Sequence, residues 1–295
     1  MATSLRTPTS TRDKLVRGRE AAALLAQLTT AQKDAILLAM ADAIASNAAS
    51  ILEANQADLN SSGLAGAMRE RLLLNPERIA AMVAGVRKVA SLPDPVGDTL
   101  AEWTRPNGLR IRKARVPLGV VGVIYESRPN VTVDTVSLAL KSGNAVVLRG
   151  GKEAVHSNQR LVEIMNGVAG VPEGAIELLD SNTRDSVHEL IKARGLVDVL
   201  IPRGGPGLIS FVTENATVPV IETGAGNCHI FVDESADTDM ADRIVINAKT
   251  QRPFVCNAVE KLLVHERIAA KYVPQIVKSC SNAAWKCAVT MRLAV

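Results

Sequence analysis

The sequence predicts an α/β protein built on a doubly wound parallel sheet, and two observations carry this prediction. Short runs rich in β-branched residues alternate along the chain with longer helical stretches, the order typical of strands joined by crossover helices. Apolar residues make up 47% of the 295 residues but aromatic residues only 2%, so the core has to be built from aliphatic side chains. This composition favours helices packed on a parallel sheet over an aromatic-rich β-sandwich.

Length and charge narrow the class of protein further. A chain of 295 residues exceeds the usual size of one domain, so we expect two domains or one large α/β unit. The net charge of +4 is spread over scattered basic and acidic residues, which does not indicate a nucleic-acid-binding protein but is compatible with a phosphorylated ligand. No apolar run approaches the length of a membrane span, so we expect a cytoplasmic protein without membrane contact.

The cysteines and histidines do not predict a metal site. The four cysteines, at positions 228, 256, 280 and 287, lack the paired spacing of zinc ligands, and reduced thiols fit a cytoplasmic location. The four histidines share no spacing, and we expect them to be structural. Cys228 and His229 are adjacent in a predicted strand, where neighbours point to opposite faces, so a Cys–His dyad is not expected there.

The first third of the chain is predicted to be mainly helical. Residues 13–60 carry apolar residues at helical spacing, with a capped helix start at Thr29 and Gln32 in the capping-box position. A further helix is predicted over residues 77–91, where two prolines end it. Residues 109–116 alternate apolar and basic side chains, which predicts a solvent-facing strand.

Buried strands and helices then alternate. Strands are predicted over residues 119–124, 145–148, 197–201 and 218–221, and helices over 131–141, 155–168 and 184–194. The loops that follow these strands are YESRPN (125–130), RGGK (149–152), PRGGPG (202–207) and ETGAGN (222–227). Ligands of α/β sheets bind at this edge, so a cofactor with phosphates fits the set of loops, although for any one glycine loop alone a simple tight turn is the more common explanation. No GxGxxG follows a strand, so the common dinucleotide fingerprint is absent.

Cys256 is the candidate nucleophile. It lies in the segment TQRPFVCNA (250–258), between a predicted helix over 239–249 and a predicted strand over 260–265. A thiol can attack a carbonyl carbon, and a carboxylate such as Glu222 can manage protons near it. The alternative is that a lone cysteine is a small buried apolar residue, but the loop position and the neighbouring segments favour catalysis.

Several ordered segments together resemble the gamma-glutamyl phosphate reductases, which are part of the aldehyde dehydrogenase superfamily. The most specific of these segments are residues 116–130, 201–205, 222–233 and 249–258, and the resemblance runs from about residue 13 to Lys278. It implies an aldehyde dehydrogenase-like fold with an NADPH-binding domain over residues 1–226 and the first part of a catalytic domain over 227–278. It also implies that a strand at about 103–116 belongs to an oligomerisation arm, and that the full-length protein is a homo-oligomer.

The resemblance further implies NADPH-dependent reduction of L-glutamate 5-phosphate to L-glutamate 5-semialdehyde and phosphate, a step of L-proline biosynthesis. Cys256 would form a thioester, and its backbone N–H would stabilise the oxyanion together with a side chain of Arg128 or Asn130. Glu222 matches the superfamily carboxylate that activates water in hydrolysing members, and its role in a reductase stays open.

The resemblance also assigns the cofactor site. Arg149 and Lys152 lie in the loop that meets the adenosine ribose in this superfamily, where two cations suit the 2′-phosphate of NADPH. The other cofactor-binding candidates are Glu126, Ser127, Arg203, Gly204 and Gly205. Two alternatives stay open: an aldehyde dehydrogenase relative that acts on a free aldehyde, and a non-catalytic nucleotide-binding fragment.

The last residues of the chain, 279–295, match no family segment, and family members continue well beyond this point. We expect a frameshift after Lys278. With one possible choice of codons for residues 279–290, restoring a single nucleotide before them changes the translation to ELQQRGVEVRGD. This segment reads as the end of a helix, a glycine and a strand, which is what the resemblance implies here. Resequencing the gene tests this expectation. Without the missing part, strand edges of the catalytic domain would be exposed, and the activity of the chain as it stands is in doubt.

Overall fold

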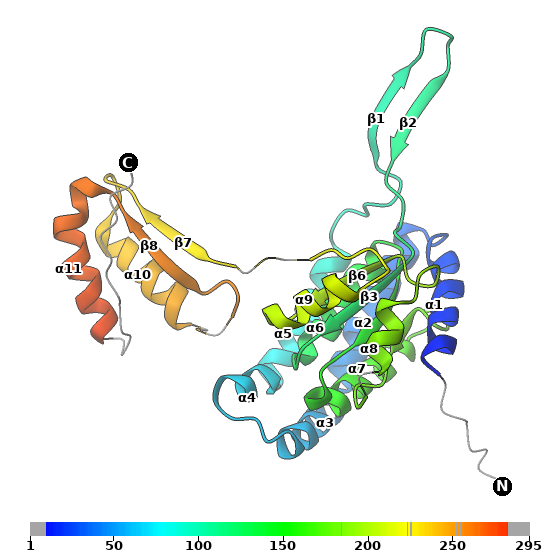
Figure 1. Cartoon of the computed structure of the whole chain (residues 1–295), viewed down its shortest axis with the longest axis horizontal. Helices are drawn as coiled ribbons and strands as arrows, with labels where there is room; N and C mark the ends of the chain where they lie inside the picture. The colour runs from blue at the N-terminus through cyan, green and yellow to red at the C-terminus, as the bar shows by residue number, and fades with distance from the viewer. Residues whose placement is uncertain are drawn as a thin grey trace. The chain divides into compact units, whose positions relative to one another are not determined.

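The computed structural model describes residues 10–183, 185–222, 224, 226–251, 253 and 255–282. The chain divides into two compact units, Met1–Thr223 and Gly224–Val295, called the first and second unit below (Figure 1). The domain boundary predicted at residue 226 lies just after this division. Residues 283–295 of the predicted non-family tail lie outside the described residues, whereas residues 279–282 continue a helix.

Helices open the first unit. They are α1 (Thr11–Leu25), α2 (Thr30–Ser46), α3 (Ala48–Ser61), α4 (Gly66–Leu72) and α5 (Pro76–Ala90). The capped start predicted for α2 is confirmed: the Gln32 backbone N–H donates to the Thr29 hydroxyl at 3.3 Å, and the Thr29 N–H donates to the Gln32 side chain at 2.9 Å. The helix predicted over 77–91 is confirmed as α5, and the helical stretch 13–60 as three successive helices. The short α4 was not predicted.

A hairpin of β1 (Thr99–Thr104) and β2 (Arg110–Ala114) extends from the body of the first unit (Figure 1). The solvent-facing strand predicted over 109–116 is confirmed as β2, which has no buried residue. The arm strand predicted at about 103–116 is the end of β1 and the whole of β2, joined by a turn in which the Gly108 N–H donates to the Arg105 carbonyl at 2.9 Å. Each strand of the arm therefore already has a partner within this chain.

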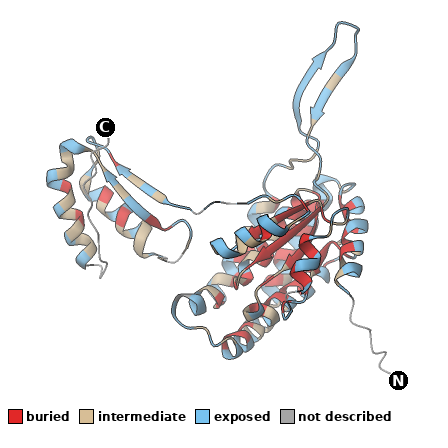
Figure 2. Cartoon of the chain, viewed as in Figure 1, coloured by how far each residue is buried: buried red, intermediate tan, exposed pale blue. Residues whose placement is uncertain are grey.

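The central sheet of the first unit is parallel, which confirms the predicted fold class. Its strands are β3 (Val120–Tyr125), β4 (Ala145–Arg149), β5 (Ile176–Leu178) and β6 (Val199–Arg203), in the order β5-β4-β3-β6. Every residue of β3 is buried, so helices cover both faces of the sheet, and Figure 2 shows the buried residues gathered there. Three of the predicted strands are confirmed as β3, β4 and β6.

Two predictions about this sheet were wrong or incomplete. Residues 218–221 form only an isolated bridge to β6, because Pro219 has no N–H and can only accept, from the Leu200 N–H at 2.8 Å. The short β5 was not predicted because it carries a glutamate at a buried position. The Glu177 carboxylate is held there by the Arg17 guanidinium at 2.8 Å.

Further helices complete the first unit. They are α6 (Pro129–Lys141), the short 3-10 helix η1 (Lys152–Ala154), α7 (Val155–Asn166), α8 (Asp185–Ile191) and α9 (Pro206–Asn215). The predicted helices over 131–141, 155–168 and 184–194 are confirmed as α6, α7 and α8. Helix α9 was not predicted, because its opening Pro206-Gly207 has the composition of a turn, although proline is also a favoured first residue of a helix. Among the described helices no single one is long and apolar enough to cross a membrane; only the pair α2 and α3, bent by 68°, reaches that length and composition together.

The second unit pairs β7 (Cys228–Val232) with β8 (Val259–Val264) in parallel, and α10 (Thr238–Thr250) and α11 (Glu266–Asn282) pack against them. Its core is formed by Val232, Ala241, Val245, Tyr272 and Ile276. The helix predicted over 239–249 and the strand predicted over 260–265 are confirmed as α10 and β8. The loop predicted to carry Cys256 therefore does connect a helix to a strand.

Candidate active site

The register of the parallel sheet brings the predicted cofactor loops of the first unit together. Ile124 of β3 pairs with Arg149 of β4, and Tyr125 pairs with Arg203 of β6. The carboxyl ends of these strands consequently lie side by side, and the loops that follow them leave the sheet at one edge. Cofactor candidates from distant parts of the sequence thus share one edge of the sheet.

Glu126 and the glycine turn after β6 are in direct contact. The Gly205 N–H, at the N-cap of α9, donates to the Glu126 carboxylate at 2.8 Å. A Cβ at Gly204 would lie 2.8 Å from the same carboxylate oxygen, so a larger residue there would force the Glu126 side chain to move. The Gly205 N–H, which the sequence suggested as a donor to a phosphate, is therefore already hydrogen-bonded to a carboxylate of the protein.

The loop after β4 packs equally closely on the end of β3. The buried Ser127 hydroxyl donates to the Glu153 carboxylate at 2.7 Å. A Cβ at Gly151 would lie 2.9 Å from both the Ser127 hydroxyl and the Glu153 carboxylate. Gly151 is thus required by this close packing, and Ser127 fixes the loop that begins η1.

The predicted cations of the site differ in their surroundings. The half-buried Arg149 guanidinium donates to the carbonyls of Gly150 at 3.1 Å, Ser181 at 3.2 Å and Thr183 at 3.0 Å. Burial lowers the pKa of Arg149, while the nearby carboxylates of Asp180 and Glu153 act in the opposite direction. Lys152 and Arg203, by contrast, are exposed. Arg149 therefore joins the loop after β4 to the loop of residues 181–183. Lys152 and Arg203 are the predicted cations that a ligand in solvent can reach.

The two oxyanion candidates lie at the start of α6. Arg128 is its half-buried N-cap residue, and its backbone N–H donates to the Glu126 carbonyl at 2.7 Å. Asn130 is exposed, and its side-chain amide donates to the Asp134 carboxylate, one turn later, at 3.2 Å. Asn130 thus presents a side-chain amide that Asp134 orients.

A buried polar network beneath these loops was not predicted. The Tyr125 and Thr132 hydroxyls are 2.7 Å apart, and Thr132 donates to the Asn158 side-chain oxygen at 2.8 Å. Burial raises the pKa of Tyr125, so its phenol is neutral and can donate. The network ties α6 and α7 to the end of β3. The sequence indicates this network only through one polar residue on the apolar face of each helix, Thr132 on α6 and Asn158 on α7.

Cys256 lies in the second unit, in the loop between α10 and β8, and is exposed. The Cys228 thiol, at the start of β7, donates to the Cys256 backbone carbonyl at 3.4 Å. A Cβ at Gly226 would lie 3.2 Å from the same carbonyl. Glu222 belongs to the first unit, is exposed, and accepts a hydrogen bond from the Thr213 hydroxyl at 3.0 Å.

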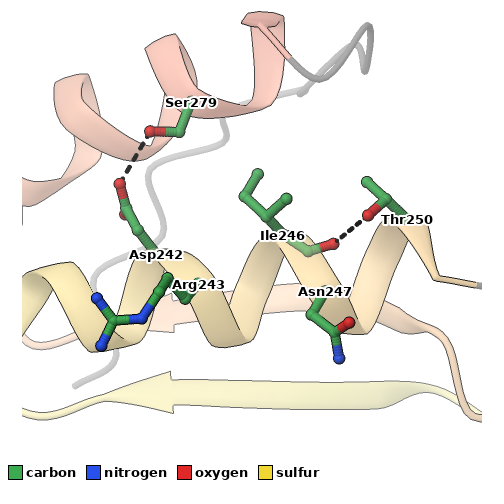
Figure 3. Close-up of a pocket in the computed structure, with 6 residues that line it drawn as sticks. All are labelled: Asp242, Arg243, Ile246, Asn247, Thr250 and Ser279. Atoms are coloured by element: carbon green, nitrogen blue, oxygen red, sulfur yellow. Dashed lines mark hydrogen bonds between the residues drawn. The ribbon is translucent and has the colours of Figure 1, made fainter.

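A separate cavity of about 400 Å³ lies between α10 and α11 (Figure 3). It is lined by Asp242, Arg243, Ile246, Asn247, Thr250 and Ser279. The Ser279 hydroxyl donates to Asp242 at 2.8 Å, and the Thr250 hydroxyl donates to the Ile246 carbonyl at 2.8 Å. None of the predicted site residues lines it. Within the described part of the chain, no cluster of histidine, cysteine and carboxylate side chains could hold a metal ion.

Comparison with known sequences connects this arrangement to one family. The sequence profile of the aldehyde dehydrogenase family matches residues 5–288, past Lys278, where we expected the resemblance to end. The chain is 69% identical over 269 residues to a gamma-glutamyl phosphate reductase of Koribacter versatilis, covering 91% of this chain and 66% of that protein. It is 58% identical over 266 residues to the same enzyme of Moorella thermoacetica, covering 88% and 64%. The chain thus spans about two thirds of the length of these relatives.

Solved structures agree with the sequences. The gamma-glutamyl phosphate reductase of Thermotoga maritima matches with a TM-score of 0.82 and 46% identity, covering 93% of this chain and 68% of that one. The enzyme of the same name from Saccharomyces cerevisiae matches with a TM-score of 0.67 and 31% identity, covering 93% and 70%. A propionaldehyde dehydrogenase from Clostridium phytofermentans, at 20% identity and a TM-score of 0.68, shares the fold. The chain therefore belongs to the aldehyde dehydrogenase family and, within it, to the gamma-glutamyl phosphate reductases.

Proposed function

We propose that this protein, in a polypeptide of its relatives' length, reduces L-glutamate 5-phosphate to L-glutamate 5-semialdehyde and phosphate with NADPH, a cytoplasmic step of L-proline biosynthesis. The observation that carries the proposal is the 69% identity to a gamma-glutamyl phosphate reductase over 91% of the chain. The exposed Cys256, on a loop between a helix and a strand, supports a covalent mechanism.

Cys256 is the nucleophile in this proposal. Its thiolate attacks the carbonyl carbon of the acyl phosphate, and the bond from that carbon to the phosphate oxygen breaks. Inorganic phosphate is released, and the acyl group stays on Cys256 as a thioester. NADPH, when bound, would supply a hydride for the reduction of this thioester. The resulting thiohemiacetal loses the sulfur as a thiolate, which releases the aldehyde and restores Cys256.

The residues at the sheet edge fit a phosphorylated nucleotide. Lys152 and Arg203 present exposed cations there, and Arg149 holds the loop that carries Lys152. Gly151 and Gly204 keep the loop backbones close to the strand ends, as a Cβ at either position would collide with its neighbours. We assign Lys152 to the 2′-phosphate and Arg203 and Gly204 to the rest of the nucleotide, while Gly205 and Ser127, which donate to Glu126 and Glu153, position these loops.

Asn130 is our choice for the oxyanion donor over Arg128. Its exposed side-chain amide is oriented by Asp134 at 3.2 Å and has a second N–H that can donate to an oxyanion. Glu222 remains a proton-handling candidate, held by the Thr213 hydroxyl at 3.0 Å. A reductase has to spare its thioester from water, so we do not assign Glu222 as the base that activates water.

The proposed reaction is tested by a protein of full family length in which residues 1–278 of this chain replace the matching part of the Koribacter versatilis enzyme. In the reverse direction, L-glutamate 5-semialdehyde should reduce NADP⁺ beyond a single turnover per enzyme only when phosphate is present. Oxidation that proceeds equally well without phosphate would instead indicate an aldehyde dehydrogenase that acts on a free aldehyde.

Lys152→Ala should weaken NADPH binding about tenfold while leaving NADH binding nearly unchanged, because a single charge-assisted contact to the 2′-phosphate is lost. Titrations that follow the fluorescence of each cofactor measure both dissociation constants. Lys113→Ala is the matched control, since Lys113 is an exposed lysine on β2 of the arm and its loss should change neither constant. An equal loss of NADPH and NADH affinity in Lys152→Ala would remove this residue from the 2′-phosphate site.

Glu126→Gln should strengthen NADPH binding about threefold to tenfold at low salt, because a glutamine still accepts from the Gly205 N–H but no longer repels phosphate. The gain should shrink as salt is added. Glu163→Gln makes the same charge change on an exposed side chain of α7 and should have no effect. Weaker binding in Glu126→Gln would mean that the carboxylate is itself a ligand of the cofactor hydroxyls.

The hairpin of β1 and β2 supports the proposal that the full-length protein is a homo-oligomer. Leu100 and Trp103 on β1 and Leu109 before β2 are 49%, 45% and 58% exposed. An extended arm with exposed apolar side chains fits a surface that another copy of the chain covers.

A further inference from the structure

We propose that Cys228 and Cys256 form a reversible intramolecular disulfide when Cys256 is oxidised by a peroxide. The pair would make Cys256 a site of redox modification, with Cys228 as the resolving thiol. This inference concerns the chain as it stands and does not depend on the substrate proposed above.

The two cysteines lie against each other in the second unit. The Cys228 thiol donates to the Cys256 carbonyl oxygen at 3.4 Å, which places its sulfur within about 6 Å of the Cys256 Cα, given the dimensions of a peptide unit. In a disulfide the S–S bond is about 2.0 Å and the two Cβ atoms are about 3.8 Å apart, so the Cys228 sulfur and the Cys256 side chain have to approach each other by about 2 Å. A rotation of the Cys256 side chain with a small loop shift would bring the sulfurs into contact.

The backbone around the pair can accommodate such a shift. The ladder between β7 and β8 is irregular beside Cys228: Cys228 pairs with Val259, whereas His229 pairs with Lys261. A residue of β8 is therefore skipped directly next to the loop that carries Cys256. Cys256 itself lies outside both strands, in the loop that precedes β8.

The exposure of the two thiols sets the order of events. Cys256 is exposed and meets the oxidant first, whereas Cys228 is partly buried. The Cys256 thiolate attacks the peroxide, the O–O bond breaks, and a sulfenic acid and hydroxide form. The Cys228 thiolate then attacks the sulfenic sulfur, a disulfide forms and hydroxide leaves, so the two thiols lose two electrons and the peroxide gains them. A dithiol returns both cysteines to the reduced state.

Cys280 is the internal control for this pairing. It lies in α11 and packs with the partly buried residues around the core of the second unit, together with Ile268 and Leu262. It is thus partly buried in the described structure, as Cys228 is, but its packing partners are core side chains. Cys287 lies outside the described residues.

The test is peptide mapping of the 295-residue chain after brief treatment with hydrogen peroxide and alkylation of the remaining thiols. Arg243 and Lys249 lie between the two cysteines, so trypsin separates them unless a disulfide links their peptides. We expect the peptide linked through Cys228 and Cys256 to be the main oxidised product and to disappear with dithiothreitol. When the chain is oxidised in urea, the link between Cys228 and Cys256 should no longer be favoured over links to the other cysteines.

Two variants complete the experiment. In Cys228→Ser, Cys256 should be recovered as sulfinic and sulfonic acid, which dithiothreitol does not reverse. Cys280→Ser should behave as the unmodified chain. The proposal is overturned if Cys256 of the unmodified chain proceeds to sulfinic acid while Cys228 stays alkylatable, or if the preferred link persists unchanged in urea. The mapping of the unmodified chain decides this even if a variant misfolds.

Discussion

Replacing Cys256 by serine should abolish turnover in the full-length protein described above, with a loss of about a thousandfold or more. A serine hydroxyl is almost entirely protonated at neutral pH, whereas a thiol supplies a thiolate. The segment 250–258 contains no histidine, so it offers no imidazole that could activate a serine hydroxyl. Without the thioester, the hydride has no acyl group to reduce.

The same variant should leave NADPH binding within about twofold, because the proposed nucleotide contacts all lie in the first unit. The dissociation constant of NADPH and the steady-state rate are measured on one preparation. Cys228→Ser is the matched control, since it makes the same change at the other cysteine of residues 1–278, which has no role in the proposed reaction, and most of the rate should remain. Turnover retained in Cys256→Ser would refute the assignment of the nucleophile.

Asp58→Ala should lower the free energy of unfolding of the chain by about 3–5 kcal/mol, the largest stability effect we expect from a single polar side chain. Asp58 lies on α3, and its side chain is only 2% exposed. Its carboxylate accepts from the backbone N–H groups of His156 at 3.0 Å and Ser157 at 2.8 Å, and from the Ser157 hydroxyl at 2.6 Å. The substitution would leave these donors at the start of α7 without an acceptor.

Urea denaturation followed by circular dichroism measures the change. Asp42→Ala is the control, because the Asp42–Arg87 ion pair at 2.8 Å joins side chains that are 70% and 54% exposed. An exposed pair of this kind contributes at most about 1 kcal/mol. If Asp58→Ala and Asp42→Ala shifted the midpoint equally, the buried carboxylate would not anchor α7 as the contacts indicate.

The helices and the main strands were predictable because their signals are local. The capping box at Thr29 and Gln32 and the aliphatic runs of β3, β4 and β6 depend on residues close in the sequence. The failures have tertiary causes. β5 keeps a buried glutamate only because Arg17, on α1, pairs with it at 2.8 Å, and residues 218–221 keep a single bridge to β6 because Pro219 has no N–H to donate.

The sequence was sufficient to predict which loops form the candidate site, but not which hydrogen bonds their residues make. Parallel strands place their carboxyl ends together, so the neighbourhood of the loops after β3, β4 and β6 followed from the fold class. The occupation of the Gly205 N–H by Glu126 depends on how two loops meet, as does the clamp that Arg149 forms with Ser181 and Thr183. Glu126 and Gly205 are about eighty positions apart, and a contact between residues so distant in the sequence leaves no local sequence pattern.

The decisive measurement is the mass of the peptide that carries Cys256 after the full-length protein has been mixed with L-glutamate 5-semialdehyde and NADP⁺ in the absence of phosphate. Without phosphate to accept the acyl group, a γ-glutamyl thioester should accumulate, and the added mass should lie on the peptide spanning residues 250–261. NADPH should form in a burst equal to the amount of enzyme. Turnover with an unmodified Cys256, or an acyl group found on another residue, would contradict the mechanism.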